Sequence, residues 1–301
     1  MKAATLFAYG DTSQIRIEDI ARPSVGKGEV LVNIAVSGLN HVETYVRQGY
    51  LAQMIPLELP ATLGIDLAGD VDAVGEGVTR FKKGDRVIGR LSLNGRGSHA
   101  ECAVAAEYQL AHLPANVSFE AGATVPLVGL TGRQAVNAVR AKAGDRVLVT
   151  GALGNVGRVA IQYLRELGLT GVAGVQASQV SDAEALGMVP VVAGEVAKAD
   201  SFDAVVDTVG GDIALAAIRS LKDGGTIAST AFVPEGTNTD GRVVLVNVMS
   251  GDDQEMLQKL ADAAGRGDLH LPIARTFPLE ELGVAYDFLA TRPEGKIIIT
   301  R

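Results

Sequence analysis

Residues 145–167 read DRVLVTGALGNVGRVAIQYLREL, and this stretch decides the fold. Its beginning, Val147–Val149, is a short apolar run of the kind that forms a buried strand. A cluster of glycines follows, and apolar side chains then recur at helical spacing at Val156, Ala160 and Leu164. The pattern predicts a strand, a tight turn and a helix.

The turn contains three glycines, Gly151, Gly154 and Gly157, spaced three residues apart. Glycine allows a sharp turn and lets a ligand approach the backbone closely, and the N–H groups that begin such a helix suit a pyrophosphate. The dinucleotide fingerprint is usually G-x-G-x-x-G, whereas two residues separate the first two glycines here. An ordinary βα turn of another doubly wound domain is therefore an alternative that the rest of the chain must decide.

The composition is that of a folded globular protein. The 301 residues are 47% hydrophobic and 21% charged, enough for one large or two medium domains. The net charge is −8 and the basic residues are scattered, which argues against nucleic acid or an anionic membrane as a partner. The single cysteine, Cys102, excludes an intrachain disulfide. Because no membrane-spanning run or leader pattern occurs, we expect a cytoplasmic location.

The region up to about Leu113 consists mainly of short β-rich runs bounded by glycine, aspartate or lysine. This spacing predicts a compact antiparallel barrel or sandwich. Residues 39–47, LNHVETYVR, interrupt it with a polar turn and a helical turn.

The periodicity changes at Ser118, which is expected to cap a helix. Pro126 is expected to break that helix, and a second helix should run from Leu130 to Ala141. Strand and helix patterns then alternate up to Val248, which predicts a doubly wound parallel sheet. We therefore predict an α/β fold in which a β-rich domain, residues 1–117 and 265–301, is interrupted by a Rossmann domain, residues 118–264.

Seven stretches together resemble the quinone oxidoreductase branch of the medium-chain dehydrogenase/reductase superfamily: LNHVETYVRQG, VDAVGEGVTRFKKGDRVIG, VPLVGLTGRQAV, KAGDRVLVTGALGNVGRVAIQ, FDAVVDTVGG, FPLEELGVAYDFL and GKIIIT. They follow the family's order over nearly the whole chain. The resemblance implies a GroES-like catalytic domain with an inserted Rossmann domain that binds NADP(H). It also suggests a homodimer, with residues 243–248 as a candidate interface strand.

The sequence argues against a metal site. Residues 64–69, GIDLAG, stand where zinc-dependent relatives carry a Gly-His-Glu motif, and the four closely spaced cysteines of their second zinc site are missing. His41, His99, His112 and His270 show no ligand spacing, and we interpret each as a surface or loop residue.

The predicted cofactor is NADPH. NAD-specific Rossmann domains place a carboxylate about twenty residues beyond the first glycine to hold the ribose hydroxyls. That position falls in residues 174–179, GVQASQ, which contain no carboxylate and also no basic residue for a 2′-phosphate. The predicted cofactor contacts are Thr131, Gly151, Leu153, Gly154, Asn155, Val156, Gly157, Gln176, Ser178, Val209, Ala231 and Phe232. The resemblance implies that Thr131 lies by the nicotinamide; a helix cap is its alternative role.

The candidate catalytic residues are Asn40, Tyr45 and Tyr50. The first two match positions at which the family lines its site with polar groups, and their side chains can donate hydrogen bonds to a carbonyl. Alternatively, Asn40 makes a turn and Tyr45 packs beneath the loop.

Together these features predict a zinc-independent, NADPH-dependent oxidoreductase. Its expected acceptor is a quinone or an α,β-unsaturated carbonyl, because conjugation spreads the incoming charge and hydrogen bonds can then replace a metal. The alternatives are an enoyl or alkenal double-bond reductase and a nucleotide-binding relative with little turnover.

Overall fold

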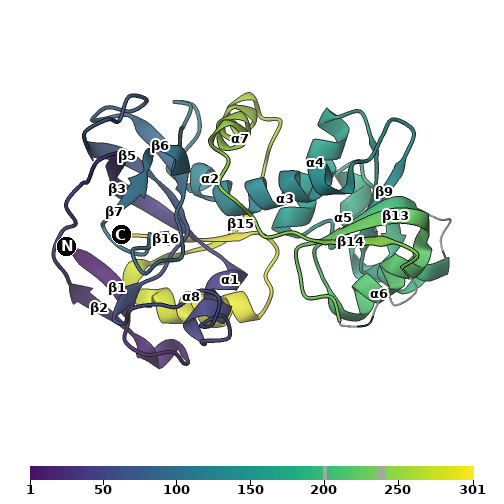
Figure 1. The fold of residues 1–301 in the computed structure, drawn as a ribbon, viewed down its shortest axis with the longest axis horizontal. Helices are drawn as coiled ribbons and strands as arrows, with labels where there is room; N and C mark the ends of the chain where they lie inside the picture. The colour runs from purple at the N-terminus through teal and green to yellow at the C-terminus, as the bar shows by residue number, and fades with distance from the viewer. Residues whose placement is uncertain (199–201, 235, 237–240) are drawn as a thin grey trace. The chain divides into compact units, whose positions relative to one another are not determined.

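The computed structural model describes residues 1–198, 202–234, 236 and 241–301. The chain folds into two compact units, Met1–Leu127 with Asp252–Arg301, and Val128–Gly251. Figure 1 shows the ribbon of both units, with labels on most of their helices and strands. The predicted α/β arrangement, a β-rich unit interrupted by a unit with a parallel sheet, is confirmed.

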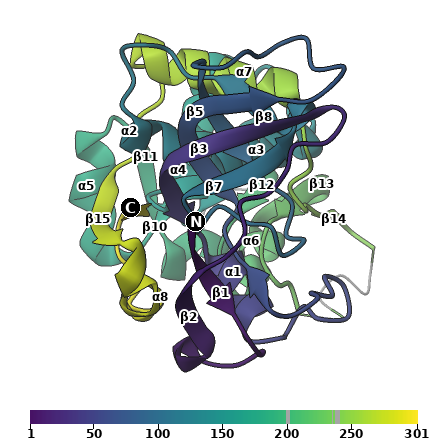
Figure 2. The same ribbon diagram turned by 90° about the vertical axis from the view of Figure 1, so that its left-hand side faces the viewer.

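The first unit is built on two sheets. A seven-stranded sheet has the order β15-β16-β3-β5-β6-β8 with β7 also paired to β3, and a three-stranded sheet has the order β2-β1-β4. Figure 2 shows β3 lying between β5 and β7. The strands are β1 (Lys2–Leu6), β2 (Ile15–Asp19), β3 (Glu29–Leu39), β4 (Ala61–Thr62), β5 (Asp66–Val74), β6 (Arg86–Arg90), β7 (Cys102–Ala106), β8 (Leu110–His112), β15 (Ile273–Pro278) and β16 (Lys296–Thr300).

The strands of the first unit that pair with one another are antiparallel, except for β15 and β16, which are parallel. Val30, Val32 and Ile34 of strand β3 point to the same face and lie in the core, and most of the other residues of the strand are buried as well. Strand β16, residues 296–300, pairs with β3, so residues from both ends of the sequence contribute to the same sheet.

Four α-helices belong wholly to the first unit: α1 (His41–Arg47), α2 (Phe119–Ala123), α7 (Gln254–Arg266) and α8 (Leu282–Ala290). The boundaries of the unit differ from those predicted, because α2 and α7 pack on it. Gln258 in α7 accepts a hydrogen bond from the backbone N–H of His112 and donates one to its carbonyl, as a neighbouring strand would. Short 3₁₀ turns complete the unit at Thr12–Gln14, Glu107–Gln109 and Leu279–Glu281.

The second unit is a six-stranded, fully parallel sheet in the order β11-β10-β9-β12-β13-β14. Numbered within the unit this is 3-2-1-4-5-6, the doubly wound strand order of dinucleotide-binding domains. All strands remain parallel, but successive strands are added on one side of β9 up to β11 and on its other side from β12 onward. The strands are β9 (Arg146–Thr150), β10 (Thr170–Val175), β11 (Val189–Val192), β12 (Phe202–Asp207), β13 (Leu221–Ser229) and β14 (Val244–Asn247).

Helices α4 (Asn155–Glu166), α5 (Val180–Ala185) and α6 (Gly211–Ser220) connect these strands, with 3₁₀ turns at Ala177–Gln179 and Ala193–Lys198. The central strand β9 is buried on both faces, and Val147, Leu148 and Val149 are each fully inaccessible to solvent. A continuous apolar run is what a strand covered on both sides requires.

Two predicted helix starts were wrong, and proline explains both. Helix α3 (Pro126–Val139) begins at Pro126 rather than after it, because proline fits the first helical position, where no N–H bond is needed. The sequence also predicts a helix that opens at Pro278, with Glu280 and Glu281 in its first turn. Pro278 instead ends β15 and precedes a 3₁₀ turn, so α8 starts only at Leu282. Among the described residues, no helix has the length and apolar character needed to cross a bilayer.

Candidate functional site

The glycine turn lies where β9 ends. Gly151 adopts a φ of 61°, a left-handed conformation that favours glycine. The N–H of Gly154 donates to the carbonyl of Gly151 at 2.9 Å, and Gly154 then forms the N-cap of α4. A Cβ on Gly157 would lie only 2.2 Å from the Gly151 oxygen, so glycine there permits close packing of helix and turn.

The turn offers groups that an anionic ligand can use. The backbone N–H of Arg158 donates a hydrogen bond to the carbonyl of Gly154, which is the first such bond of α4. The N–H groups of residues 155–157 precede it in the first turn of the helix and can face a ligand. Gly154 is exposed. The side-chain oxygen of Asn155 is buried and has no hydrogen-bond partner among the described residues. A buried polar atom of this kind indicates a missing partner.

Several predicted cofactor residues gather at this edge of the sheet. A Cβ on Gly151 would lie 2.9 Å from Cγ2 of Val209, and one on Gly210 would lie 3.1 Å from Cβ of Ala231. The backbone N–H of Gly211 donates to the carbonyl of Phe232 at 3.0 Å. Thus the segments after β9, β12 and β13 meet, and the side chains of Val209 and Phe232 remain exposed.

The other predicted cofactor residues lie elsewhere in the second unit. Gln176 and Ser178 are exposed at the end of β10, where the side chain of Gln179 accepts a hydrogen bond from the Gln176 N–H. Leu153 is buried inside the turn, and Val156 is half-buried in the first turn of α4. Thr131 is buried within α3 and follows five helical residues, so the alternative interpretation as a helix cap is wrong.

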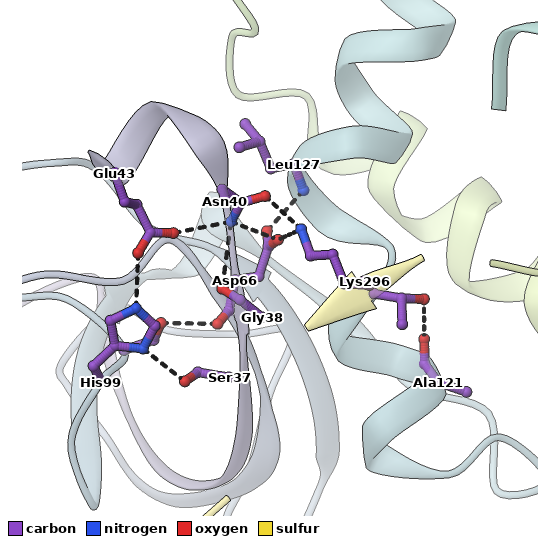
Figure 3. Close-up of polar contacts among 11 residues, drawn as sticks. Ser37, Gly38, Asn40, Glu43, Asp66, His99, Ala121, Leu127 and Lys296 are labelled. Carbon is purple, nitrogen blue, oxygen red and sulfur yellow. Dashed lines mark hydrogen bonds and ion pairs between the residues drawn. The ribbon is translucent and has the colours of Figure 1, made fainter. Parts of the chain in front are cut away.

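The first unit contains a buried polar network around Asn40, the residue that precedes α1. The amide nitrogen of Asn40 lies 3.0 Å from Oε1 of Glu43 and 3.0 Å from Oδ2 of Asp66. The Lys296 ammonium donates to Oδ1 of Asn40 and to Oδ2 of Asp66, the latter at 2.7 Å. Figure 3 shows Asn40 between Glu43 on one side and Asp66 and Lys296 on the other.

Asp66 also holds the beginning of α3. Its Oδ1 accepts a hydrogen bond from the backbone N–H of Leu127 at 2.8 Å. A carboxylate at this position satisfies one of the helix's unpaired N–H groups and interacts favourably with the helix dipole. One carboxylate therefore joins β5, where Asp66 lies, to β16, which carries Lys296, and to the first turn of α3.

The network continues from Glu43 through His99. Nε2 of His99 lies 2.7 Å from Oε2 of Glu43, and its Nδ1 lies 2.9 Å from Oγ of Ser37. The Tyr286 hydroxyl donates to Glu43 at 3.4 Å; burial, together with the nearby Glu43 charge, raises the pKa of Tyr286 well above its ordinary value. The side chains of His99 and Glu43 are fully buried. His99 lies in the loop between β6 and β7, as one of our two interpretations has it, but its burial shows that it is not a surface residue.

The sequence contained a signal for this network that pattern reasoning did not use. Asn40 and Glu43 are three residues apart on a helical turn, Asp66 lies within GIDLAG, and Lys296 begins GKIIIT. A charged residue at the start of an apolar strand indicates a buried ion pair, because Lys296 needs an acidic partner if the strand lies in the core.

The candidate tyrosines lie at the surface. Tyr45 on α1 is 52% exposed, so the alternative in which it packs beneath the loop is wrong, and Tyr50 is 74% exposed. Asn40 is 5% exposed, and its amide already contacts Glu43, Asp66 and Lys296. Its side chain makes no bond that caps α1.

His41 follows Asn40 and begins α1. Although solvent reaches its imidazole, the surrounding protein lowers the pKa of His41 below its ordinary value. Loss of hydration is the main cause, followed by the positive charges of Lys296 and Arg292.

Comparisons with known proteins support this description. Residues 26–115 match the family model for the alcohol dehydrogenase GroES-like domain, and residues 175–299 match the model described as zinc-binding dehydrogenase. A solved alcohol dehydrogenase superfamily protein from Novosphingobium aromaticivorans is 30% identical, with a TM-score of 0.89 over 100% of this chain and 99% of that one. This chain belongs to the alcohol dehydrogenase superfamily. The resemblance to medium-chain dehydrogenases and reductases is thereby confirmed.

Two further proteins to which this chain is similar bear on function. The quinone oxidoreductase of Homo sapiens is 38% identical over 183 residues, which are 60% of this chain and 54% of that protein. The chain thus spans about half the length of this curated relative. A mycobacterial protein solved in complex with NADPH is 27% identical, with a TM-score of 0.86 over the full length of both chains.

Proposed function

We propose that this protein is a zinc-independent, NADPH-dependent oxidoreductase that reduces a quinone or an α,β-unsaturated carbonyl. The glycine turn at the reversal point of the 3-2-1-4-5-6 sheet carries the proposal. In open α/β sheets, ligands bind at the carboxyl ends of the strands where the order reverses. The open first turn of α4 fits a dinucleotide there, as does the side-chain oxygen of Asn155, which has no hydrogen-bond partner in the described part of the chain.

The preference for NADPH rests on the end of β10. Gln176 and Ser178 are exposed there and can donate hydrogen bonds to a 2′-phosphate, and no carboxylate in residues 174–179 would repel it. A mycobacterial superfamily member binds NADPH, which supports the same choice. Thr131, Val209, Ala231 and Phe232 remain the proposed contacts for the rest of the cofactor.

The side chains of the first unit do not fit a zinc ion. The Lys296 ammonium contacts Asp66 and Asn40, so a cation already neutralises the carboxylate of GIDLAG. Both ring nitrogens of His99 are paired, and the Cys102 thiol lies against the sulfur of Met1. Within the described part of the chain, no three His, Cys, Asp or Glu side chains form a group that could hold a metal. The proposed reaction therefore uses no zinc ion.

Bound NADPH would supply the hydride. The chain itself must then bind the acceptor and stabilise the charge that develops on its oxygen. We propose that Tyr45 and Tyr50, whose side chains are exposed, donate hydrogen bonds to that oxygen. Asn40 is the third candidate; because its amide is engaged by Glu43, Asp66 and Lys296, we propose that it positions the segment that precedes α1.

The decisive experiment measures oxidation of NADPH and NADH by the purified protein with benzoquinones, naphthoquinones, enones and enals. We expect turnover with quinones or enones, a lower KM for NADPH than for NADH, and no loss after treatment with a zinc chelator. Reduction of carbon–carbon double bonds alone would favour the enoyl or alkenal reductase. Tight NADPH binding without turnover of any acceptor would favour the non-enzymatic relative.

We further propose a homodimer that forms along β14. This strand ends the parallel sheet of the second unit, and Val244 on it is 52% exposed. An apolar edge strand offers unpaired backbone groups to a second copy. Sedimentation equilibrium of the wild type and of Val244→Lys tests this, since a lysine on an edge strand should give monomers.

A further inference from the structure

A single buried carboxylate, that of Asp207, joins three adjacent strands of the second unit. Asp207 ends β12 and is fully buried. Its Oδ1 accepts a hydrogen bond from Thr150, the last residue of β9, at 2.6 Å. Its Oδ2 accepts one from Ser229, the last residue of β13, also at 2.6 Å. Hydrogen bonds to a carboxylate are among the stronger ones in proteins.

The same carboxylate fixes the loop that follows β12. The backbone N–H groups of Val209 and Gly210 lie 3.2 Å from its oxygens. The hydroxyl of Ser229, held by Asp207, in turn accepts the N–H of Ala231 at 3.2 Å. The loops after β12 and β13 are therefore tied to one side chain.

A third connection reaches the glycine turn. The Thr150 hydroxyl that donates to Asp207 accepts the backbone N–H of Thr208, and the Thr208 hydroxyl donates to the Thr150 carbonyl at 2.7 Å. Thr150 directly precedes Gly151, which adopts its left-handed conformation next to Thr208 and Val209. The direction in which the chain enters the turn thus depends on these bonds.

We infer that Asp207 is a positioning residue for the dinucleotide: it holds the glycine turn, Val209 and Ala231 in the arrangement that binds the pyrophosphate and the nicotinamide half. The inference rests on the proposed function. According to this inference, Asp207 aligns three loops although it has no exposed surface itself. These loops lie at the sheet edge where ligands bind in this fold. Preorganised loops bind with less loss of entropy, so loosening them costs affinity.

The experiment compares Asp207→Asn with the wild type by NADPH fluorescence titration and by binding of adenosine 2′,5′-bisphosphate, which lacks the pyrophosphate bridge and the nicotinamide. The asparagine keeps the shape but directs an NH₂ group at one hydroxyl that needs an acceptor. We expect the Kd for NADPH to rise by roughly tenfold or more, with a much smaller change for the bisphosphate. A general loss of structure would weaken both ligands equally.

Asp203→Asn is the matched control, because Asp203 lies near the other end of the same strand, where it accepts the Arg146 N–H and pairs with Lys222. It should leave both affinities unchanged. If Asp207→Asn does not fold, Ser229→Ala and Thr150→Val, which each remove one donor, should show the same selective loss to a smaller degree. If Asp207→Asn weakens the binding of both ligands equally, or of neither, the inference about Asp207 is overturned but the proposed function is not. A wild-type protein that does not bind NADPH overturns the proposed function as well.

Discussion

Nζ of Lys296 lies 2.7 Å from Oδ2 of Asp66, and these side chains are 2% and 0% exposed. Loss of one member of a buried ion pair leaves the other charge uncompensated, which typically costs about 3–5 kcal/mol. We therefore predict that Lys296→Met lowers the free energy of unfolding by an amount in this range. Urea denaturation followed by circular dichroism measures it.

The matched control for this prediction is Lys2→Met. Lys2 pairs with Glu280 at 3.3 Å, but both side chains are about half exposed, and ion pairs in contact with solvent contribute little to stability. The double variant Lys296→Met with Asp66→Asn should recover part of the stability lost by the first change, because the stranded negative charge is gone. If Lys296→Met and Lys2→Met lower the free energy of unfolding equally, the buried ion pair stabilises the protein no more than the exposed one.

Two glycines of the turn should respond differently to alanine. A Cβ on Gly157 would lie 2.2 Å from the Gly151 oxygen and 2.7 Å from Cα of Ala152, so Gly157→Ala should destabilise the second unit itself. A Cβ on Gly154 would meet only the Gly151 oxygen, at 3.2 Å, and the φ of Gly154 is an ordinary −70°. The protein can therefore accommodate Gly154→Ala almost without strain.

If Gly154 serves the approach of a ligand, Gly154→Ala should fold normally but bind NADPH at least roughly tenfold more weakly. Thermal unfolding and NADPH titration of both variants measure the two effects separately. Unchanged NADPH affinity in a folded Gly154→Ala protein would count against a pyrophosphate at this turn.

The sequence predicted the second unit well because its signals are local. The apolar run before Gly151 and the helical spacing after Gly157 each depend on a few neighbouring residues, and the β-α alternation follows from repeating them. Helix starts at Pro126 and Leu282 were less accurate, since proline both ends and begins helices and local pattern does not separate the two roles.

The network of the first unit could not be predicted in the same way. Asn40, Asp66 and Lys296 come from three distant parts of the chain, and only the pairing of β16 with β3 and of β3 with β5 brings them together. His99 has no flanking motif, and its burial follows from tertiary packing. Among the candidate residues, Asn40 lies in this network, whereas Tyr45 and Tyr50 were selected by position and are exposed.

His41 should titrate below the ordinary histidine value of 6.5. A lowered pKa means that the fold favours the neutral imidazole. This contribution to stability is fully present above the unfolded-state value and is lost as the pH falls through the folded-state pKa. The chain has four histidines, so NMR titration can follow each one. Arg292→Gln should raise the pKa of His41, because it removes one of the two nearby positive charges. A His41 pKa at or above 6.5 in the intact protein would contradict the prediction.

Tyr45→Phe should reduce turnover if the Tyr45 hydroxyl donates a hydrogen bond to the acceptor oxygen. Removing one donor to a developing negative charge usually costs a factor of about 10² in kcat, whereas uniform substrate binding would appear in KM instead. Because Tyr45 is 52% exposed, loss of its hydroxyl should leave thermal stability unchanged, and the kinetic effect can be read directly. Tyr50→Phe, at 74% exposure, is the matched comparison, and the double variant shows whether the two hydroxyls act together. A kcat unaltered by Tyr45→Phe across several good acceptors would remove Tyr45 from the reaction and leave Tyr50 as the remaining hydroxyl donor among the candidates.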